Sequence, residues 1–252
     1  MERVIEVCCG SYEDALASYT GGAKRIELNS ALYLGGLTPT LASLILTKKH
    51  TDLKVITMVR PRGAGFCYTE AEFETMKVDA RLMMENGADG IAFGCLTKEG
   101  EIDVEQTKTM IAIIKEYTGK EYTGEVVFHR AFDCVKDADK AMETLIDLHV
   151  DRVLTSGLKP KAMEGIDMIA HLQEKYGDKI QILAGSGMNA SNALEMMEKT
   201  GIWQVHSSCK NWRNDPTTSG ECVNYCYAPS PHENDYDVVD EALVRKIVNS
   251  VC

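Results

Sequence analysis

The stretch Val126-Val127-Phe128-His129-Arg130-Ala131-Phe132-Asp133 changes its chemical character abruptly in the middle. Its first three residues are apolar, with two β-branched side chains, and are typical of a short buried parallel strand. An imidazole and a guanidinium follow at once, and a carboxylate comes three residues after them. Charged and polar groups are found at the end of a buried strand when they form a functional site there or when they neutralise one another. The stretch therefore predicts a parallel sheet with a polar site at the carboxyl ends of its strands.

The same design recurs along the chain, each time as a short apolar run that is polar at or near its carboxyl end. The other runs are Val4–Val7, Arg25–Leu28, Val55–Arg60, Ile91–Gly94, Arg152–Thr155, Ile180–Ala184 and Trp203–His206. A helix signal follows each strand, and no linker rich in Pro, Gly or Ser divides the chain. This alternation requires a parallel sheet with outer helices and right-handed crossovers. Eight units predict an α/β fold, a TIM-like (β/α)8-type barrel that forms a single domain over residues 1–252.

The last third of the chain carries three helix expectations and one irregular segment. Helices are expected from about Lys161 to Tyr176, from near Asn189 or Ser191 to Gly201, and from Val238 to about Val251. Residues 209–237 contain three prolines and are expected to form an irregular loop. In a barrel this loop would lie over the C-terminal mouth, where active sites are found.

Composition narrows the class of protein. The chain has 252 residues, of which 44% are hydrophobic, and this is enough to form one large core. Its net charge is −11. No stripe of Lys and Arg is present, so nucleic acid is not an expected partner. No apolar run approaches the ~20 residues that span a bilayer, so no membrane association is expected. A strand begins almost at once, at Val4, which leaves no room for a signal peptide and favours a cytoplasmic location.

The nine cysteines are an odd number in a chain too large to need disulfides. They are expected to be reduced thiols, most of them packed as small apolar residues. No CxxC pair occurs, and neither the adjacent Cys8 and Cys9 nor the pair Cys222 and Cys226 has the spacing of a structural zinc site.

The predicted strand ends gather acids and imidazoles. We expect seven residues to converge on one pocket at the C-terminal barrel mouth, namely Glu6, Glu27, Arg60, Arg62, His129, Asp133 and His206. The catalytic set among them is Glu6, Glu27, His129, Asp133 and His206. His129 would act as general acid/base, oriented by Asp133 or Glu27, although either histidine could also bind a soft metal. The alternative is a polar plug that closes the barrel end.

A second set of residues suits an anionic ligand. Arg60 and Arg62 flank a proline and would form a fork for a carboxylate or phosphate, or would instead hold Glu6 and Glu27. The turn at Gly185–Gly187 precedes a helix, and barrel phosphate sites favour the loops after the seventh and eighth strands. The expected substrate-binding residues are Arg60, Arg62, Ser156, Gly185, Gly187 and Ser207.

Cys8 follows Glu6 and is the candidate metal ligand. A thiol near imidazoles would favour Cu(I) or zinc over magnesium, whereas the alternative is a packed cysteine with no ligand role.

At these residues the chain resembles the CutC copper-homeostasis protein family over nearly its whole length. The motifs that carry the resemblance are Glu6–Cys8, Ala23–Leu28, Gly35–Pro39, Arg60–Gly63, Phe66–Tyr68, Phe128–Asp133, Leu154–Gly157 and Val205–Ser208. The resemblance implies a TIM-like barrel, a cytoplasmic protein, copper handling, and a homodimer or higher homo-oligomer. It also implies Cu(I) binding by two cysteines, of which one corresponds to Cys8. At the position of the other, this chain has Asn29.

Two functions follow from the sequence and the resemblance together. The first is a cytoplasmic copper-homeostasis protein that binds Cu(I) as its cofactor or cargo through Cys8. The alternative is an enzyme that acts on a small anionic or phosphorylated metabolite at the barrel mouth. The expected partner is accordingly a copper ion or a small anionic molecule, and the sequence leaves open whether the protein is an enzyme.

Overall fold

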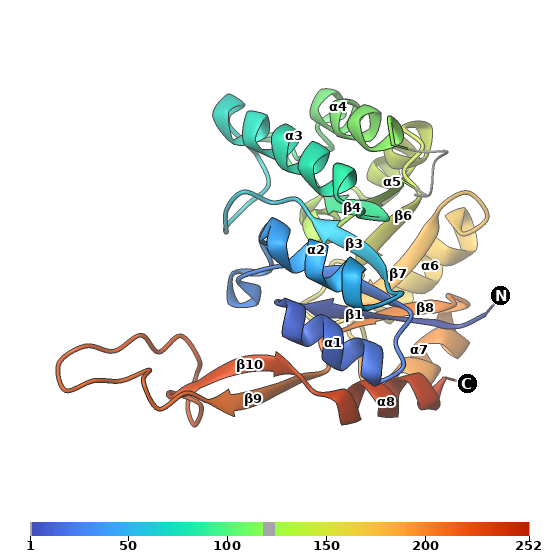
Figure 1. Ribbon diagram of the computed structural model, residues 1–252. Helices are drawn as coiled ribbons and strands as arrows, with labels where there is room; N and C mark the ends of the chain where they lie inside the picture. The colour runs from blue at the N-terminus through green and yellow to red at the C-terminus, as the bar shows by residue number, and fades with distance from the viewer. Residues whose placement is uncertain (1, 118–123, 252) are drawn as a thin grey trace.

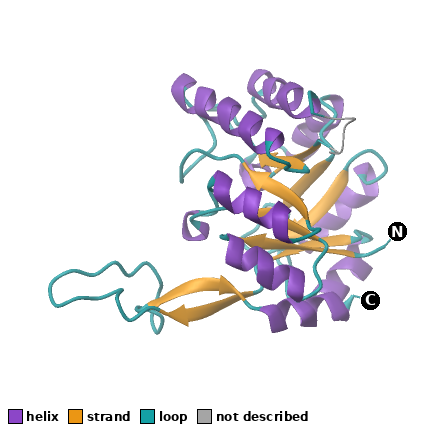
Figure 2. Ribbon diagram, viewed as in Figure 1, coloured by secondary structure: helices purple, strands orange, loops and turns teal. Residues whose placement is uncertain are grey.

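The computed structural model describes residues 2–117 and 124–251, and its centre is a closed barrel of eight parallel strands (Figures 1 and 2). The strands lie next to one another in chain order, and β1 closes the ring by pairing with β8. Their bounds are β1 Val4–Cys9, β2 Arg25–Leu28, β3 Lys54–Met58, β4 Gly90–Phe93, β5 Glu125–Phe128, β6 Arg152–Thr155, β7 Gln181–Gly185 and β8 Gln204–Ser207. The predicted barrel is thereby confirmed.

Helices surround the barrel, as Figure 2 shows. They are α1 Tyr12–Thr20, α2 Leu41–His50, α3 Glu70–Glu85, α4 Val104–Lys115, α5 Ala138–Asp147, α6 Ile166–Tyr176, α7 Ala193–Thr200 and α8 Glu241–Ser250, with short 3-10 helices at Leu32–Leu34 and Arg130–Cys134. Side-chain caps define several of the starts. In α3, for example, Thr69 and Glu72 form a reciprocal capping box that satisfies two backbone N–H groups.

The register of the first strands puts polar side chains on one face. Glu6 of β1 lies opposite Arg25 of β2 and opposite His206 of β8, and Cys8 lies opposite Glu27. Partners in a ladder point to the same side of a sheet, as do residues two apart along a strand. All five side chains therefore share one face of the sheet.

The barrel interior is only partly apolar. Ile56, Met58, Ala92 and Val127 form a small apolar cluster that is separate from the main core, which includes the residues packed between strands and helices. Next to them lies a network of buried charges. Arg25 Nε contacts Glu6 Oε2 at 2.6 Å, and Arg152 Nη2 contacts Glu125 Oε2 at 2.8 Å. Buried charges are tolerated only when they are paired in this way.

Residues 209–237, expected to be an irregular loop, contain regular structure at both ends. Strands β9, Lys210–Asn214, and β10, Asp235–Val239, form an antiparallel hairpin. Figure 1 shows this hairpin and its connecting loop, in orange and red, extending away from the barrel beside α1. The hairpin is tied to α1 because Val239 N donates to Asp14 Oδ1 at 2.8 Å.

Three helices begin later than expected, of which α7 differs least, since it begins at Ala193 and was expected from near Asn189 or Ser191. The last helix was expected from Val238, but that residue pairs within the hairpin, and α8 begins after Asp240, whose carboxylate caps Leu243 N. The sixth was expected from Lys161, but α6 begins at Ile166. The backbone of Gly165 packs so closely on the loop after β6 that an added Cβ would lie 2.1 Å from Ser156 O.

Within the described residues, no helix combines the length and the apolar character that crossing a membrane requires.

We predict that Arg152→Met destabilises the fold by roughly 3 kcal/mol, because it leaves Glu125 and Glu6 with fewer buried cations. Arg152 is 1% exposed and contacts both carboxylates. The measurement is urea unfolding at neutral pH. Lys108→Met is the matched control, since Lys108 pairs with Glu105 on the surface and should change stability by less than about 0.5 kcal/mol. Equal effects of the two substitutions would show that the interior network adds nothing.

Candidate functional site

A cavity of about 720 Å³ opens at the carboxyl ends of the barrel strands. Its walls include seven residues that the sequence analysis selected, namely Cys8, Glu27, Arg60, His129, Asp133, Gly187 and His206. Glu6 lies beneath His206 and does not line the cavity. The strand ends thus bring most of the expected catalytic set to one place.

Glu6 connects the cavity to the buried charges below it. One carboxylate oxygen is 2.8 Å from His206 Nδ1, and the other is 2.6 Å from Arg25 Nε and 3.7 Å from Arg152 Nη1. Burial alone would raise the pKa of Glu6, but Arg25, His206 and Arg152 outweigh it and hold the pKa below its ordinary value. Glu6 is therefore an anion, and His206 donates its Nδ1–H to it.

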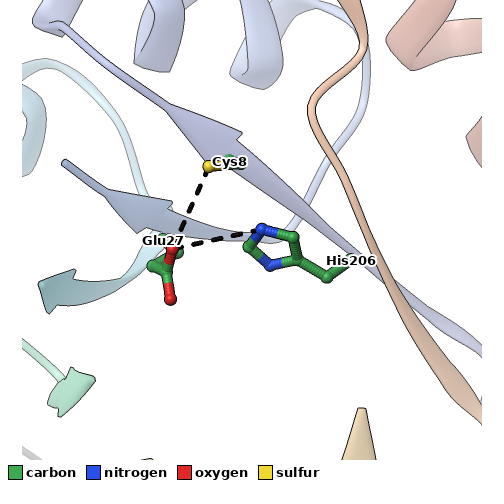
Figure 3. A group of neighbouring side chains, drawn as sticks. All are labelled: Cys8, Glu27 and His206. Carbon is green, nitrogen blue, oxygen red and sulfur yellow. Dashed lines mark hydrogen bonds and ion pairs between the residues drawn. The ribbon is translucent and has the colours of Figure 1, made fainter. Parts of the chain in front are cut away.

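Cys8, Glu27 and His206 form a compact cluster on the cavity wall (Figure 3). One ligand atom from each lies within 4.8 Å of the others. Glu27 Oε2 lies between its neighbours, 3.9 Å from Cys8 Sγ and 4.0 Å from His206 Nε2. Sulfur, nitrogen and oxygen atoms at this spacing can surround a single metal ion.

Burial and mutual charge set the protonation of this cluster. Burial raises the pKa of Glu27, and burial together with the Glu27 charge raises the pKa of the Cys8 thiol well above its usual value. Burial lowers the pKa of His206, but the hydrogen bond to Glu6 and the nearby carboxylates raise it further than burial lowers it. Without a metal, the raised pKa values favour the protonated forms of Glu27 and Cys8. A bound soft cation would stabilise their deprotonated, negatively charged forms instead.

Asn29 completes this side of the cavity. Its Nδ2 donates to Glu27 Oε2 at 3.0 Å and approaches Cys8 Sγ at 3.6 Å. The side chain is buried, so it lies within reach of the two proposed ligands.

His129 follows β5 and has a different environment. Its Nδ1 accepts the Ala131 N–H at 3.1 Å, so in the neutral ring the proton is on Nε2. That Nε2 is buried and has no hydrogen-bond partner among the described residues. Burial, followed by the charge of Arg60, lowers the pKa of His129 to about 3. These features favour a neutral hydrogen-bond donor over the general base expected from sequence.

Arg60 reaches the cavity, but Arg62 does not. Arg60 donates to the carbonyl oxygens of Leu34, Gly36 and Ala64 at 2.6–2.9 Å and holds neither Glu6 nor Glu27. The Arg62 guanidinium instead forms an ion pair with Glu72 and is absent from the cavity wall. The expected arginine fork is therefore wrong, because Arg62 joins the capping box of α3.

Asp133 is held by the loop after β6 and not by His129. Its carboxylate accepts Thr155 Oγ1–H at 2.6 Å, Ser156 N–H at 3.0 Å, and Arg130 Nε–H at 2.7 Å. The expectation that Asp133 orients His129 is therefore corrected. The carboxylate oxygens of Asp133 instead accept hydrogen bonds from the donors of the loop after β6. Ser156 is fully buried by the same contacts and does not line the cavity, contrary to its expected role.

Two residues of the expected phosphate turn, Ser186 and Gly187, border the cavity, and Gly185 does not. Gly187 lines it with a left-handed φ of +80°, whereas Gly185 lies inside β7 and packs closely on Leu154. The Ser207 hydroxyl is buried and donates to Met188 O at 2.7 Å, so it is not available to a ligand. Gly185 and Ser207 are thus structural residues in this geometry.

Several cavity residues escaped the sequence analysis. Lys161 and Lys210 add positive charge at the cavity, and Met58, Phe66 and Leu154 add apolar surface. Lys161 had been assigned to a helix and Lys210 to an irregular loop. Phe66 and Leu154 lie in motifs of the family resemblance, which was the one available signal for them.

The chain is similar in sequence to proteins of one known family. The model of the CutC family matches residues 3–211. A CutC family protein of Treponema denticola is 43% identical over 248 residues, which are 98% of each chain. The copper homeostasis protein cutC homolog of Homo sapiens is 40% identical over 84% of this chain and 75% of its own.

Solved structures of similar fold include a protein of the same family. A crystal structure of a CutC protein from Streptococcus agalactiae superposes with a TM-score of 0.75 at 28% identity, covering 82% of this chain and 98% of that one. The phosphoribosylanthranilate isomerase of Pyrococcus furiosus has a TM-score of 0.56 at 14% identity, covering 99% of this chain and 98% of its own. The second likeness concerns the barrel fold alone.

We predict that His129 makes stability depend on pH. Its pKa is about 3 in the folded protein, against 6.5 ordinarily, so below about pH 6.5 the unfolded chain binds a proton that the folded protein does not. The free energy of unfolding therefore decreases as the pH is lowered. Going from about pH 7 to about pH 5 should cost the natural protein about 2 kcal/mol more than it costs His129→Gln.

Urea unfolding of both proteins at the two pH values measures this difference. Comparing changes with pH removes the constant effect of the substitution itself. Equal losses in the two proteins would mean that His129 titrates normally in the fold.

Proposed function

Because this chain belongs to the CutC family, we propose that it is a copper-homeostasis protein that binds Cu(I) through Cys8 and His206, with Glu27 as a third ligand. The observation that carries the proposal is the placement of these three ligand atoms within 4.8 Å of one another. Thiolate and imidazole are the donors that Cu(I) prefers among those present. The carboxylate adds charge compensation.

The surroundings of His206 suit a ligand role. Glu6 takes the Nδ1–H, so the lone pair of Nε2 is directed toward Glu27 in the deprotonated ring. A carboxylate bonded to the far nitrogen of a ligating histidine orients the ring and makes it a stronger donor. Glu6 would thus support the metal without touching it.

Asn29 distinguishes this chain from the two-cysteine arrangement that the family resemblance implies. The amide approaches Cys8 Sγ, so a sulfur at this position would lie beside the first thiol. We infer that the natural protein holds copper through one thiolate and that its affinity is lower than that of a two-thiolate site.

We predict that Asn29→Cys tightens Cu(I) binding by at least about tenfold, because a second thiolate replaces an amide. Cys8→Ser should weaken binding by a similar factor or abolish it. The measurement is competition with a Cu(I) chelator under reducing conditions. Cys67, Cys134 and Cys222 are exposed thiols and are first replaced by Ser in every protein compared, which removes adventitious sites.

Asn29→Ser is the matched control, since it removes the amide without adding a soft ligand. It should leave the affinity within a few-fold of the parent protein. The same affinity for the parent and Cys8→Ser would exclude Cys8, and no binding by any of the proteins would exclude the proposal.

Location and assembly are proposed on the same basis. Cu(I) and free thiols both require a reducing compartment, and the eight described cysteines are unpaired, which supports the cytoplasm. The family resemblance supports a homodimer or higher homo-oligomer.

A second function is favoured by the size of the cavity. A volume of about 720 Å³ far exceeds what one metal ion needs and lies in the range of small-molecule sites. Lys161, Lys210 and the Gly187 turn line it, which suits an anionic metabolite. We propose on this ground that the protein also binds, as an enzyme would, a small anionic or phosphorylated molecule.

A thermal-shift screen of anionic metabolites should find compounds that raise the melting temperature, since a ligand stabilises only the state it binds. Lys161→Ala should reduce the shift. Failure of every anionic compound would count against this second function.

A further inference from the structure

We propose that the cavity wall at the ends of β3 and β5 is a binding site for the carboxylate of a small organic acid, with His129 Nε2–H as its donor and Arg60 as its cation. The inference rests on the second proposed function, binding of an anionic molecule, and names the chemistry of its anchor. It does not depend on copper.

The barrel order separates this site from the metal cluster. Cys8, Glu27 and His206 lie on β1, β2 and β8, which are neighbours in the ring. His129 follows β5, which is four strands from β1 in either direction. His129 therefore faces the metal cluster across the cavity, and Arg60, which follows β3, lies on the wall between β2 and β5.

His129 is fixed in the orientation that the proposal needs. The Ala131 N–H holds Nδ1, and the ring lies so close to Gly94 that a Cβ added there would be 2.6 Å from Nδ1 and Cε1. The proton is consequently on Nε2, at the edge of the ring that makes neither contact. His129 is 3% exposed, and Nε2 has no acceptor among the described residues. A buried donor without an acceptor costs free energy unless a ligand supplies one.

Arg60 is a buried cation without an anion. It is 5% exposed, and its terminal nitrogens are occupied by the carbonyl oxygens of the loops after β2 and β3. No carboxylate forms an ion pair with it within the described part of the chain, and burial keeps the neighbouring Tyr68 hydroxyl neutral by raising its pKa. An unpaired buried charge is costly, so a negative group is expected beside it.

The carboxylates of the cavity wall are held elsewhere. Asn29 holds Glu27, the loop after β6 holds Asp133, and the Tyr227 hydroxyl donates to Asp237. The Phe66 ring lies 5.1 Å from the centre of the His129 ring and 5.1 Å from Arg60 Cζ, so it packs against both groups. An anion from outside the protein is the remaining way to satisfy both.

The geometry indicates the class of anion. The terminal nitrogens of Arg60 already donate to three carbonyl oxygens, whereas its buried Nε has no hydrogen-bond partner among the described residues. An anion would therefore meet one hydrogen bond from His129, the Arg60 Nε–H and the field of the guanidinium. This suits one oxygen of a carboxylate better than a phosphate, which calls for several donors. The apolar side chains of Met58 and Leu154 also line the cavity and leave room for a short carbon chain.

The test is a titration of the full-length, chelator-treated protein with pyruvate and malonate, followed by calorimetry and by ¹H–¹⁵N spectra of the histidine rings. We expect saturable binding and a downfield shift of the His129 Nε2 proton. His129→Phe retains a ring but removes the donor, and should weaken binding by about 10- to 100-fold. His129→Gln retains an N–H and should stay within about tenfold of the natural protein.

His171→Gln is the control, because His171 is an exposed surface residue that pairs with Asp139. It should bind both acids normally. Cu(I) competition is measured separately on the natural protein, so failure of this inference and failure of the copper proposal are distinguishable.

Three results would overturn the inference: no saturable binding of either acid, unchanged binding in His129→Phe, or a His129 proton found on Nδ1. Inorganic phosphate that binds through His129 where the acids do not would overturn the carboxylate assignment. The ring spectra of the natural protein decide the tautomer even if His129→Phe does not fold.

Discussion

The Glu6 carboxylate joins the buried charges of the barrel interior to the chemistry of its mouth. It contacts Arg25 through one oxygen and His206 through the other. Without it the interior would hold two guanidiniums with less compensation, which a low-dielectric core does not tolerate. The same contact orients the His206 ring and directs its Nε2 toward Glu27. A residue that does not line the cavity thus determines what one wall of the cavity can bind.

Two histidines at strand ends acquire opposite character from their neighbours. His206 is surrounded by Glu6 and Glu27, which raise its pKa despite burial. His129 is buried beside Arg60, and both effects lower its pKa. One wall of the cavity therefore attracts cations through acids, a thiol and an imidazole. The other wall offers a neutral N–H and an unpaired positive charge. A molecule or ion pair that carries both signs could contact both walls.

Polar groups in the loops mostly satisfy one another. Asp133 accepts hydrogen bonds from the turn after β6, Arg62 pairs with Glu72, and Ser207 donates to a backbone carbonyl. Each looked like a ligand group because it follows a strand. Loops contain many backbone groups without partners, and nearby side chains satisfy these first. Among the residues that the sequence selected, Cys8, Glu27 and His206, which belong to the strands, and His129, which follows β5 directly, remain open to a ligand.

The sequence alone was sufficient to predict the barrel, because eight short apolar runs, each followed by a helix signal, permit little else. The period of two along a strand also indicated that Glu27, His129 and His206 would meet at one mouth. Only the tertiary structure decided how their charges are distributed. Pairing of Glu6 with Arg25, and the lack of an acid paired with Arg60 within residues 2–117 and 124–251, depend on strand register and loop paths that involve residues far apart in the chain. The hairpin of β9 and β10 was likewise invisible in the sequence, since β9 is mostly exposed, β10 is mostly half-buried, and neither strand has an apolar alternation.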